Sequence, residues 1–153
     1  MPDYHERFFD MIKERSRLSA EIIVPKIINI FHPMSVIDVG CGMGIWLSEF
    51  QKCGVDIFGI DNCINEDQLL IPKNKFKNHN LEHDIEFYQR FDVALALEVA
   101  EHLSPARSEF FVEFLTSLAP VVIFSAAIPG QGGMHHLNEQ WAPFWIQIFD
   151  KKK

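Results

Sequence analysis

The sequence lacks a long apolar run, a secretion signal and an excess of positive charge. Its apolar runs, such as 121–124 and 126–128, are far shorter than the roughly 20 apolar residues that cross a bilayer. Residues 1–7 are polar and lack the apolar stretch of a signal peptide. These absences predict a cytoplasmic protein without a membrane partner.

The chain also has few cysteines, and they are not arranged in pairs. Cys41, Cys53 and Cys63 form no Cys-x-x-Cys motif. An odd number of cysteines without a secretion signal fits reduced thiols in a cytoplasm. Their spacing matches no set of metal ligands, so we interpret them as small apolar side chains.

The charge balance restricts the class of partner. The formal net charge is −7, whereas a protein that follows nucleic acid through its phosphates needs a basic face. The 153 residues, 48% of them hydrophobic, suffice for one globular domain with its own core. Composition therefore makes nucleic acid an unfavourable partner, and it favours a small molecule or a sugar.

A glycine turn between a strand pattern and a helix pattern is the most informative feature. Residues 36–44 read Val-Ile-Asp-Val-Gly-Cys-Gly-Met-Gly, and residues 45–52 predict a helix. Strand, glycine turn and helix form a nucleotide pocket at the carboxyl end of the first strand of an α/β sheet. Asp61 ends a second strand-like run, where an acid can accept both hydroxyls of a ribose. The pattern indicates a nucleoside-containing cofactor.

The glycine spacing separates two classes of cofactor. The dinucleotide fingerprint is Gly-x-Gly-x-x-Gly, but here the glycines are Gly40, Gly42 and Gly44, and Ile45 occupies the third dinucleotide position. A glycine turn whose backbone comes close to the ligand, but need not hold a diphosphate, suits S-adenosylmethionine (SAM). The amino end of the following helix offers unpaired N–H groups to the SAM carboxylate. The spacing thus favours SAM over a nicotinamide dinucleotide.

Three segments resemble the class I SAM-dependent methyltransferases. Residues 36–44 are similar to motif I of that family, and Asp61 to its ribose-binding acid. Residues 91–103, Phe-Asp-Val-Ala-Leu-Ala-Leu-Glu-Val-Ala-Glu-His-Leu, resemble its fourth strand and the turn that follows. Residues 129–141 resemble a segment after the fifth strand in a bacterial and phage subgroup. The resemblance covers about residues 34–149 and says little about the methyl acceptor.

The resemblance implies cofactor contacts at the ends of the first four strands. Asp38 would orient the glycine turn or the cofactor's amino group, although it could also simply cap the turn. Asn80 would accept a hydrogen bond from the adenine amine, although asparagine is also a routine turn residue. The full set of predicted cofactor contacts is Asp38, Gly40, Cys41, Gly42, Gly44, Asp61, Asn62, Asn80, Leu81, Leu97, Glu98 and Val99.

Three histidines are candidate general bases. His102 follows the fourth strand directly after Glu101, and its alternative role is a scaffold hydrogen bond. His135 and His136 lie in a glycine-rich segment after the fifth strand, where active-site loops collect. With Glu139 they suggest a His-x-x-x-Glu metal pair, but no third ligand is evident. We therefore predict no metal.

The element pattern predicts an α/β fold with a doubly wound, mostly parallel, Rossmann-like sheet of about five strands. Strands are expected at 35–39, 55–60, 76–79, 92–97 and 121–126, with helices at 44–53, 65–70 and 105–118. Residues 1–33 form a helical cap in which Pro25 either begins a second helix or kinks it, and residues 34–149 form the SAM-binding core. All 153 residues belong to one domain.

The family sheet normally has seven strands, the last two forming a hairpin, and this chain has no room for them. It is expected to be either a natural minimal version or a truncated sequence. A final helix should begin within 138–141, and its apolar stripe contains Trp141, Phe144, Trp145 and Ile148. We expect that stripe to fold back onto the sheet, or to join two chains in a homodimer.

Two functions from different classes follow. The first is a SAM-dependent methyltransferase acting on a small-molecule or sugar acceptor. The alternative is a non-catalytic or partner-dependent SAM-binding module, which the short carboxyl end suggests. A nicotinamide oxidoreductase is a third, weaker interpretation, because the glycine spacing does not fit and no group for hydride transfer is evident.

Overall fold

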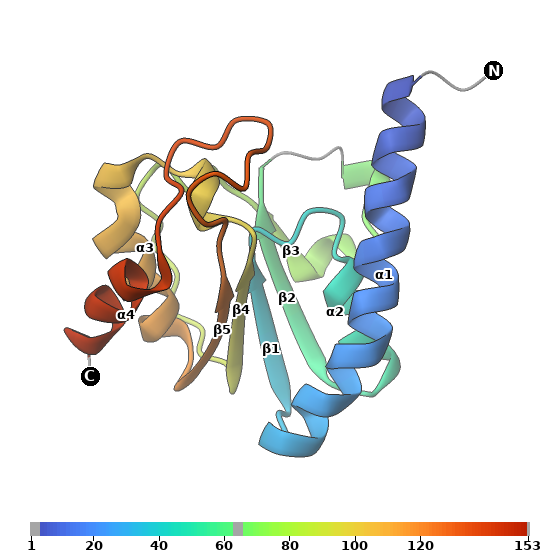
Figure 1. The fold of residues 1–153 in the computed structure, drawn as a ribbon. Coiled ribbons are helices and arrows are strands. Elements are labelled where there is room, and N and C mark those ends of the chain that lie inside the picture. The colour runs from blue at the N-terminus through green and yellow to red at the C-terminus, as the bar shows by residue number, and fades with distance from the viewer. Residues whose placement is uncertain (1–3, 63–65, 153) are drawn as a thin grey trace.

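The computed structural model describes residues 4–62 and 66–152, which form a five-stranded parallel sheet between two layers of helices (Figure 1). The strands are β1 (Ser35–Val39), β2 (Asp56–Asp61), β3 (Phe76–Asn78), β4 (Val93–Leu97) and β5 (Val121–Ser125). Their spatial order is β3-β2-β1-β4-β5, and all neighbours pair in parallel. The predicted α/β class and doubly wound sheet are confirmed, with strand bounds within about one residue of expectation.

The central strands are apolar on both faces, and alternate side chains belong to two separate cores. In β1, Val36 packs into one hydrophobic cluster and Ile37 into the other, and both are fully buried. Successive side chains of a strand point to opposite faces of the sheet. This explains why β4, Val-Ala-Leu-Ala-Leu, appears in the sequence as a continuous hydrophobic run rather than an alternating one.

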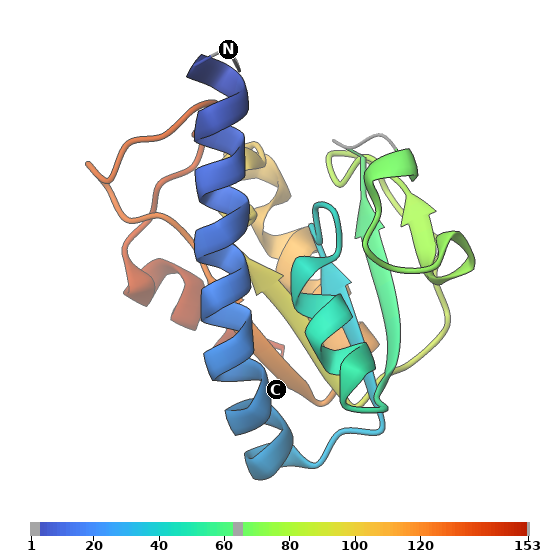
Figure 2. The same cartoon turned by 90° about the vertical axis from the view of Figure 1, so that its right-hand side faces the viewer.

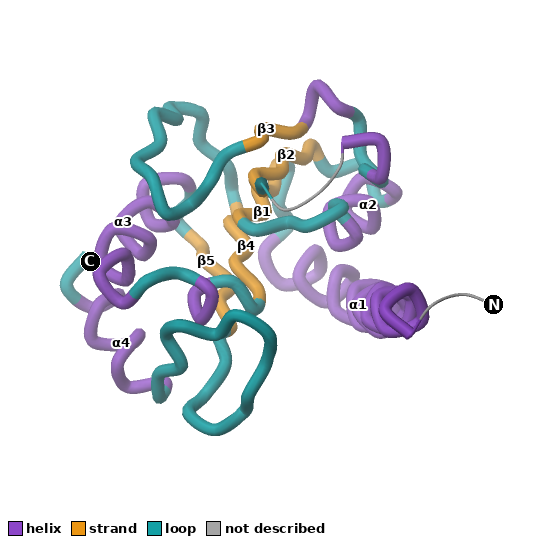
Figure 3. The backbone as a smooth tube through the Cα atoms, turned by 90° about the horizontal axis from the view of Figure 1, so that it is seen from above, coloured by secondary structure: helices purple, strands orange, loops and turns teal. Residues whose placement is uncertain are grey.

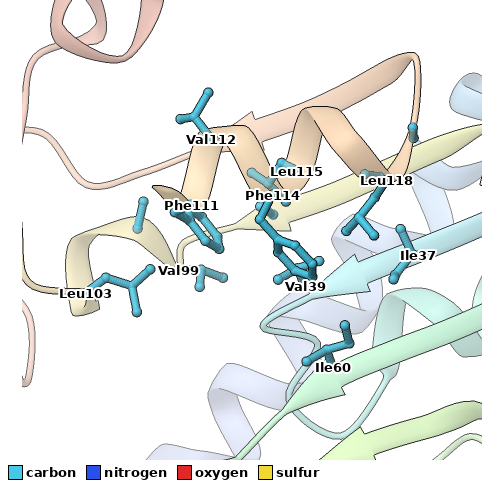
Figure 4. Close-up of a cluster of buried hydrophobic side chains, with 14 of the residues drawn as sticks. Ile37, Val39, Ile60, Val99, Leu103, Phe111, Val112, Phe114, Leu115 and Leu118 are labelled. Carbon is cyan, nitrogen blue, oxygen red and sulfur yellow. The ribbon is translucent and has the colours of Figure 1, made fainter. Parts of the chain in front are cut away.

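Two helices cover each face. The helices α1 (Tyr4–Phe31) and α2 (Ile45–Lys52) lie on one side of the sheet, and α3 (Ser108–Leu118) and α4 (Ala142–Asp150) lie on the other (Figure 2). The core under α3 includes Phe111, Leu115 and Leu118, which pack against Ile37 and Ile60 of the sheet (Figure 4). The two layers leave the carboxyl ends of the strands open at one edge of the sheet.

The first helix differs from the prediction at Pro25. One continuous α-helix runs from Tyr4 to Phe31, so a second helix does not begin at Pro25. A proline within a helix deprives the carbonyl four residues earlier, here that of Glu21, of its N–H partner. Both residues are exposed, so water can supply the missing hydrogen bond. The buried positions Ala20, Val24 and Ile27 hold the helix against α2 and the sheet.

Three other helix predictions are corrected. The expected helix at 65–70 is only a 3-10 turn, Glu66–Gln68, within the described residues. The expected helix at 105–118 divides into a 3-10 turn, Pro105–Arg107, and α3. The last helix begins at Ala142 instead of within 138–141, because Pro143 stands in its first turn, where a missing N–H costs nothing.

The fold-back of the last helix is confirmed for part of its stripe. Trp145 and Ile148 are buried, and Phe124 of β5 contacts Trp145 and Phe149 with ring centroids 5.1 and 5.4 Å apart. Trp141, however, is 58% exposed. Among the described residues no strand pairs with the outer edge of β5, and a groove of about 850 Å³ lies between β5 and α4.

Within the described segments, no helix is both long enough and apolar enough to cross a bilayer.

Candidate cofactor and acceptor site

The glycine turn after β1 is built by backbone hydrogen bonds and positive φ angles. Gly40, Gly42 and Gly44 have φ of 86°, 53° and 80°, a left-handed region that favours glycine. The amides of Gly40 and Cys41 donate to the Ile60 carbonyl at 2.7 and 3.2 Å. These bonds tie the turn to the end of β2, next to Asp61.

The glycines differ in what surrounds them. A Cβ built on Gly40 would overlap the side chain of Val99, and one built on Gly44 would press on Ile71 at 3.0 Å. At Gly42 nothing lies within 4 Å of such an atom. Gly40 and Gly44 are therefore needed for packing, whereas the space beside Gly42 is open to a ligand.

Asp61 lies at the glycine turn, as the sequence predicted. Its Oδ2 accepts a hydrogen bond from the Gly42 amide at 2.8 Å, and its side chain is mostly buried. The next residue, Asn62, is exposed. The carboxylate is thus held against the backbone of Gly42, and two residues predicted to contact the cofactor lie together.

Asp38 is the buried acid of this region. It is 3% exposed, and burial raises its pKa to about 7, with a smaller contribution from the negative charge of Asp61. An acid in this position is poised between its neutral and ionised forms near neutral pH. A cationic ligand group beside it would favour the ionised form.

The cysteines remain thiols in the described residues. Cys41 is buried in the turn, and burial raises the pKa of its thiol, so it stays protonated and unreactive. Cys53 is exposed, and Cys63 lies outside the described residues. The apolar interpretation of Cys41 therefore fits its surroundings.

The segment after β3 contributes a turn. Asn80 is exposed, and its Oδ1 accepts a hydrogen bond from the Glu82 amide at 3.0 Å. The Asn80 carbonyl accepts another from the His83 amide. Leu81 is half-buried against the main core. Asn80 thus has the turn-residue bonds that were its alternative role, although its position at the same sheet edge is as predicted.

The end of β4 brings the next predicted group to the edge. Leu97 is half-buried and Val99 is buried against Gly40. Glu98 between them has a φ of 58°, unusual for a residue other than glycine, and its amide donates to the Ser125 carbonyl at 3.1 Å. The kink turns the exposed Glu98 side chain outward, where its Oε2 accepts a bond from Gln131.

The residues after Val99 form a short 3-10 helix, Ala100–His102, that buries a carboxyl group. Glu101 is 1% exposed, and its Oε2 is buried without a hydrogen-bond partner. Burial raises the pKa of Glu101, and the charge of Glu98 raises it further, against the opposing effects of backbone hydrogen bonds and of His102. A buried oxygen without a partner is costly unless a ligand satisfies it.

Two histidines from distant segments stand beside Glu101. His102 and His136 have ring centroids 4.9 Å apart in an edge-to-face arrangement. One ligand atom each of Glu101, His102 and His136 lies within 4.8 Å of the others. We call these three residues the histidine cluster. His135 is exposed, has a φ of 61°, and is not part of the cluster.

Glu139 organises the glycine-rich loop, residues 126–141, that carries His136. Its carboxylate accepts bonds from the Gly130 and Gly132 amides at 2.8 and 3.0 Å and from Nδ1 of His136 at 2.8 Å. These three donors, that of His136 first, lower the pKa of Glu139, so it is ionised and can only accept. In the neutral form of the His136 ring, a bond to this acceptor requires the proton on Nδ1, and Nε2 then keeps its lone pair.

The sequence contained every residue of this arrangement but did not reveal the third member of the cluster. In the sequence Glu101 is evident only as the neighbour of His102, and the His-x-x-x-Glu pattern places the acid partner of the loop histidines within the loop itself. In the structure Glu139 is hydrogen-bonded to Nδ1 of His136. The acid beside the two histidines is Glu101, which lies in the 3-10 helix that follows β4. The only available signal was that both segments follow adjacent strands at the same edge of the sheet.

The two halves of the site lie at one edge of the sheet, seen from above in Figure 3. The turn after β1 lies toward the middle of the sheet, and the loop after β5 lies beside the ends of β4 and β5. Val99 joins them, since it contacts Gly40 and precedes Glu101 by two residues. The groove between β5 and α4 is a separate feature, because none of the predicted site residues lines it.

A family model described as a methyltransferase domain matches residues 4–148. A ubiquinone biosynthesis O-methyltransferase of Rhodopseudomonas palustris (strain BisA53) is 27% identical over 134 residues, which cover 81% of this chain and 48% of that protein. The chain thus spans about half the length of the curated relatives that it matches.

Solved structures show the same fold at low identity. A SAM-dependent methyltransferase from Archaeoglobus fulgidus aligns with a TM-score of 0.72 and 18% identity, covering 98% of this chain and 74% of that one. Magnesium protoporphyrin IX methyltransferase from Synechocystis PCC 6803, solved with bound SAH, aligns with a TM-score of 0.68 and 14% identity, covering 99% and 78%.

Proposed function

The chain belongs to the methyltransferase-domain family, and from this premise we propose that it binds SAM at the glycine turn and transfers the methyl group to a small-molecule acceptor. The carrying observation is the open space beside Gly42, whose amide donates to the Asp61 carboxylate, together with the buried Asp38, which lies near enough to Asp61 to respond to its charge. SAM, with a ribose, a carboxylate and two cationic groups, complements an open turn with two acids.

The acceptor would bind beside the histidine cluster, which is the polar part of the same edge of the sheet. Its nucleophile attacks the methyl carbon, the bond from that carbon to sulfur breaks, and the bonding electrons neutralise the sulfonium. Much of the acceleration comes from alignment of the three atoms, because positioning alone is worth about 7–11 kcal/mol. If the nucleophile arrives protonated, the cluster is where its proton is removed. The relatives named as O-methyltransferases support an oxygen nucleophile.

Asp61 gives the sharpest test of cofactor binding. In Asp61→Ala the acceptor for ribose hydroxyls is lost, so SAM affinity measured by calorimetry should fall by about 1.5–3 kcal/mol. Asp56→Ala is the matched control, because Asp56 begins the same strand at the opposite end and should leave affinity unchanged. Unchanged affinity in a folded Asp61→Ala protein would exclude this site.

A non-catalytic or partner-dependent SAM-binding module is the second candidate, because the glycine turn and Asp61 could bind the cofactor without an acceptor. The two candidates share the cofactor and differ in turnover. Incubation with SAM labelled in the methyl group, followed by chromatography of a metabolite extract, separates them. A labelled acceptor supports catalysis, whereas SAM binding without any labelled acceptor supports the module.

We also propose a cytoplasmic location and a homodimer formed through the carboxyl-terminal end. The free thiols of Cys41 and Cys53 support a reducing compartment. The exposed Trp141 and Ile146 near the groove, together with the edge of β5, support self-association. Light scattering tests the dimer: a monomer at every concentration would contradict it, and a dimer that dissociates on Ile146→Glu would support it.

A further inference from the structure

The histidine cluster has the composition of a metal site with open positions. We infer that Glu101, His102 and His136 bind one divalent transition-metal ion, such as Zn²⁺, at the acceptor end of the site. Two imidazoles and one carboxylate are an established zinc ligand set, in which the remaining position takes water or substrate. Their ligand atoms lie within 4.8 Å of one another. Ligands bound at about 2.0–2.2 Å are at most about 4.4 Å apart, so small side-chain rotations suffice.

An orphaned oxygen points independently to a ligand. Glu101 is 1% exposed, and its Oε2 has no hydrogen-bond partner. Buried carboxylates are costly unless they are paired or coordinate a metal. The backbone of the same residue is firmly fixed, because the Glu101 carbonyl accepts bonds from the amides of Leu137 and Asn138 at 2.7 and 3.0 Å. These bonds also hold the glycine-rich loop against the cluster.

Glu139 prepares His136 to act as a ligand. By accepting a hydrogen bond from Nδ1, Glu139 leaves the lone pair of Nε2 available. Metal sites use the same carboxylate–histidine pair to orient their imidazole ligands. A side chain on Gly133 would overlap His136 at Nε2, so the glycine keeps this nitrogen clear. The ionised carboxylate of Glu139 stands directly behind His136, and its negative charge favours a cation at the cluster.

The site is accessible from solvent. His102 is exposed and His136 is half-buried, so coordination positions remain open. A hydroxyl oxygen of the acceptor that binds the ion loses its proton to solvent more readily, because a bound cation lowers the pKa of its ligand. The resulting oxyanion forms the new bond to the methyl carbon while the electrons of the carbon–sulfur bond go to sulfur. Only this role of the ion rests on the proposed function.

The binding test needs no methyl transfer. The protein is treated with a chelator, and Zn²⁺ is then titrated by calorimetry. We expect one ion per chain, with affinity at least tenfold weaker in Glu101→Gln, His102→Gln and His136→Gln. Co²⁺ should give the visible absorption of a bound ion, and the same variants should lose it. His135→Asn is the matched control, because His135 lies in the same loop outside the cluster and asparagine tolerates its positive φ.

Absence of saturable Zn²⁺ binding would overturn the inference, and so would binding that survives all three substitutions, for example at the exposed Cys53. Should the buried Glu101→Gln protein fail to fold, the two histidine variants still decide the result. SAM affinity measured on the same samples keeps the two proposals apart. A protein that binds SAM without Zn²⁺ contradicts only the metal site, and one that binds Zn²⁺ without SAM contradicts only the proposed function.

Discussion

The two halves of the candidate site are held in place by different forces. The glycine turn is fixed by backbone bonds to β2 and by close packing of Gly40 against Val99. The base of the glycine-rich loop is also held by backbone bonds, from Leu137 and Asn138 to the Glu101 carbonyl. Its outer part, residues 130–136, is held by side chains, through the three bonds to Glu139 and the bond between Glu98 and Gln131. The glycine turn is therefore part of the fold itself, whereas the outer part of the loop depends on a few polar contacts and can be altered locally.

A substitution at Gly40 should have the largest effect and should damage the whole domain. In Gly40→Val the new side chain would overlap Val99 and would adopt a positive φ. The left-handed conformation costs about 1–2 kcal/mol and overpacking about 1–3 kcal/mol more. We expect the free energy of unfolding, measured in urea, to fall by about 2–5 kcal/mol.

Gly42→Ala is the control for this substitution. It places a methyl group in open space at a φ of 53°, so it should cost only the conformational part, about 1–2 kcal/mol. It should nevertheless weaken SAM binding, because the methyl group enters the cofactor's space. If Gly42→Ala destabilised the domain as much as Gly40→Val, the distinction between packing and ligand glycines would be wrong.

Asp38 should make cofactor binding depend on pH. With its pKa at about 7, binding of a cationic group beside it requires loss of its proton. SAM affinity should therefore increase with pH up to about 7 and level off above. At pH 5.5, about 1.5 units below that pKa, the loss approaches 2 kcal/mol at about 1.4 kcal/mol per unit.

Asp38 also determines in which direction the free energy of unfolding changes with pH in the absence of ligand. The folded protein keeps its proton on Asp38 up to pH 7, whereas the unfolded chain releases it near 3.8. The unfolded state therefore binds fewer protons, and stability should fall as pH rises from about 4 to 7. Asp38→Asn should remove this slope and the pH dependence of SAM affinity, while both would persist if another group were responsible.

The smallest effect is expected from Glu139→Gln in the loop. The amide cannot replace a charged acceptor for three donors, but the loop is exposed, so the free energy of unfolding should change by less than about 1 kcal/mol. Hydrogen exchange at the Gly130 and Gly132 amides should become faster, and SAM affinity should stay normal. A global loss of stability would show that the loop is as much a part of the core as the glycine turn.

The contrast between the halves also explains what the sequence could predict. The turn, Asp61 and the five strands are local patterns, since glycine spacing and hydrophobic runs reflect conformations within a few residues. The histidine cluster and the bonds of Glu139 depend on how two loops meet after adjacent strands, which no local pattern encodes. The predicted start of α4 was wrong for a local reason, because Pro143 in the first turn determines where the helix begins.

The contact between Val99 and Gly40 has a thermodynamic consequence. Val99 packs against the glycine turn and immediately precedes the 3-10 helix that carries Glu101 and His102. A ligand that displaces the turn should therefore also displace these two members of the histidine cluster. Linkage then requires reciprocity: the factor by which SAM changes the affinity for the ion equals the factor by which the ion changes the affinity for SAM. Four titrations, each ligand with and without the other, would close this cycle.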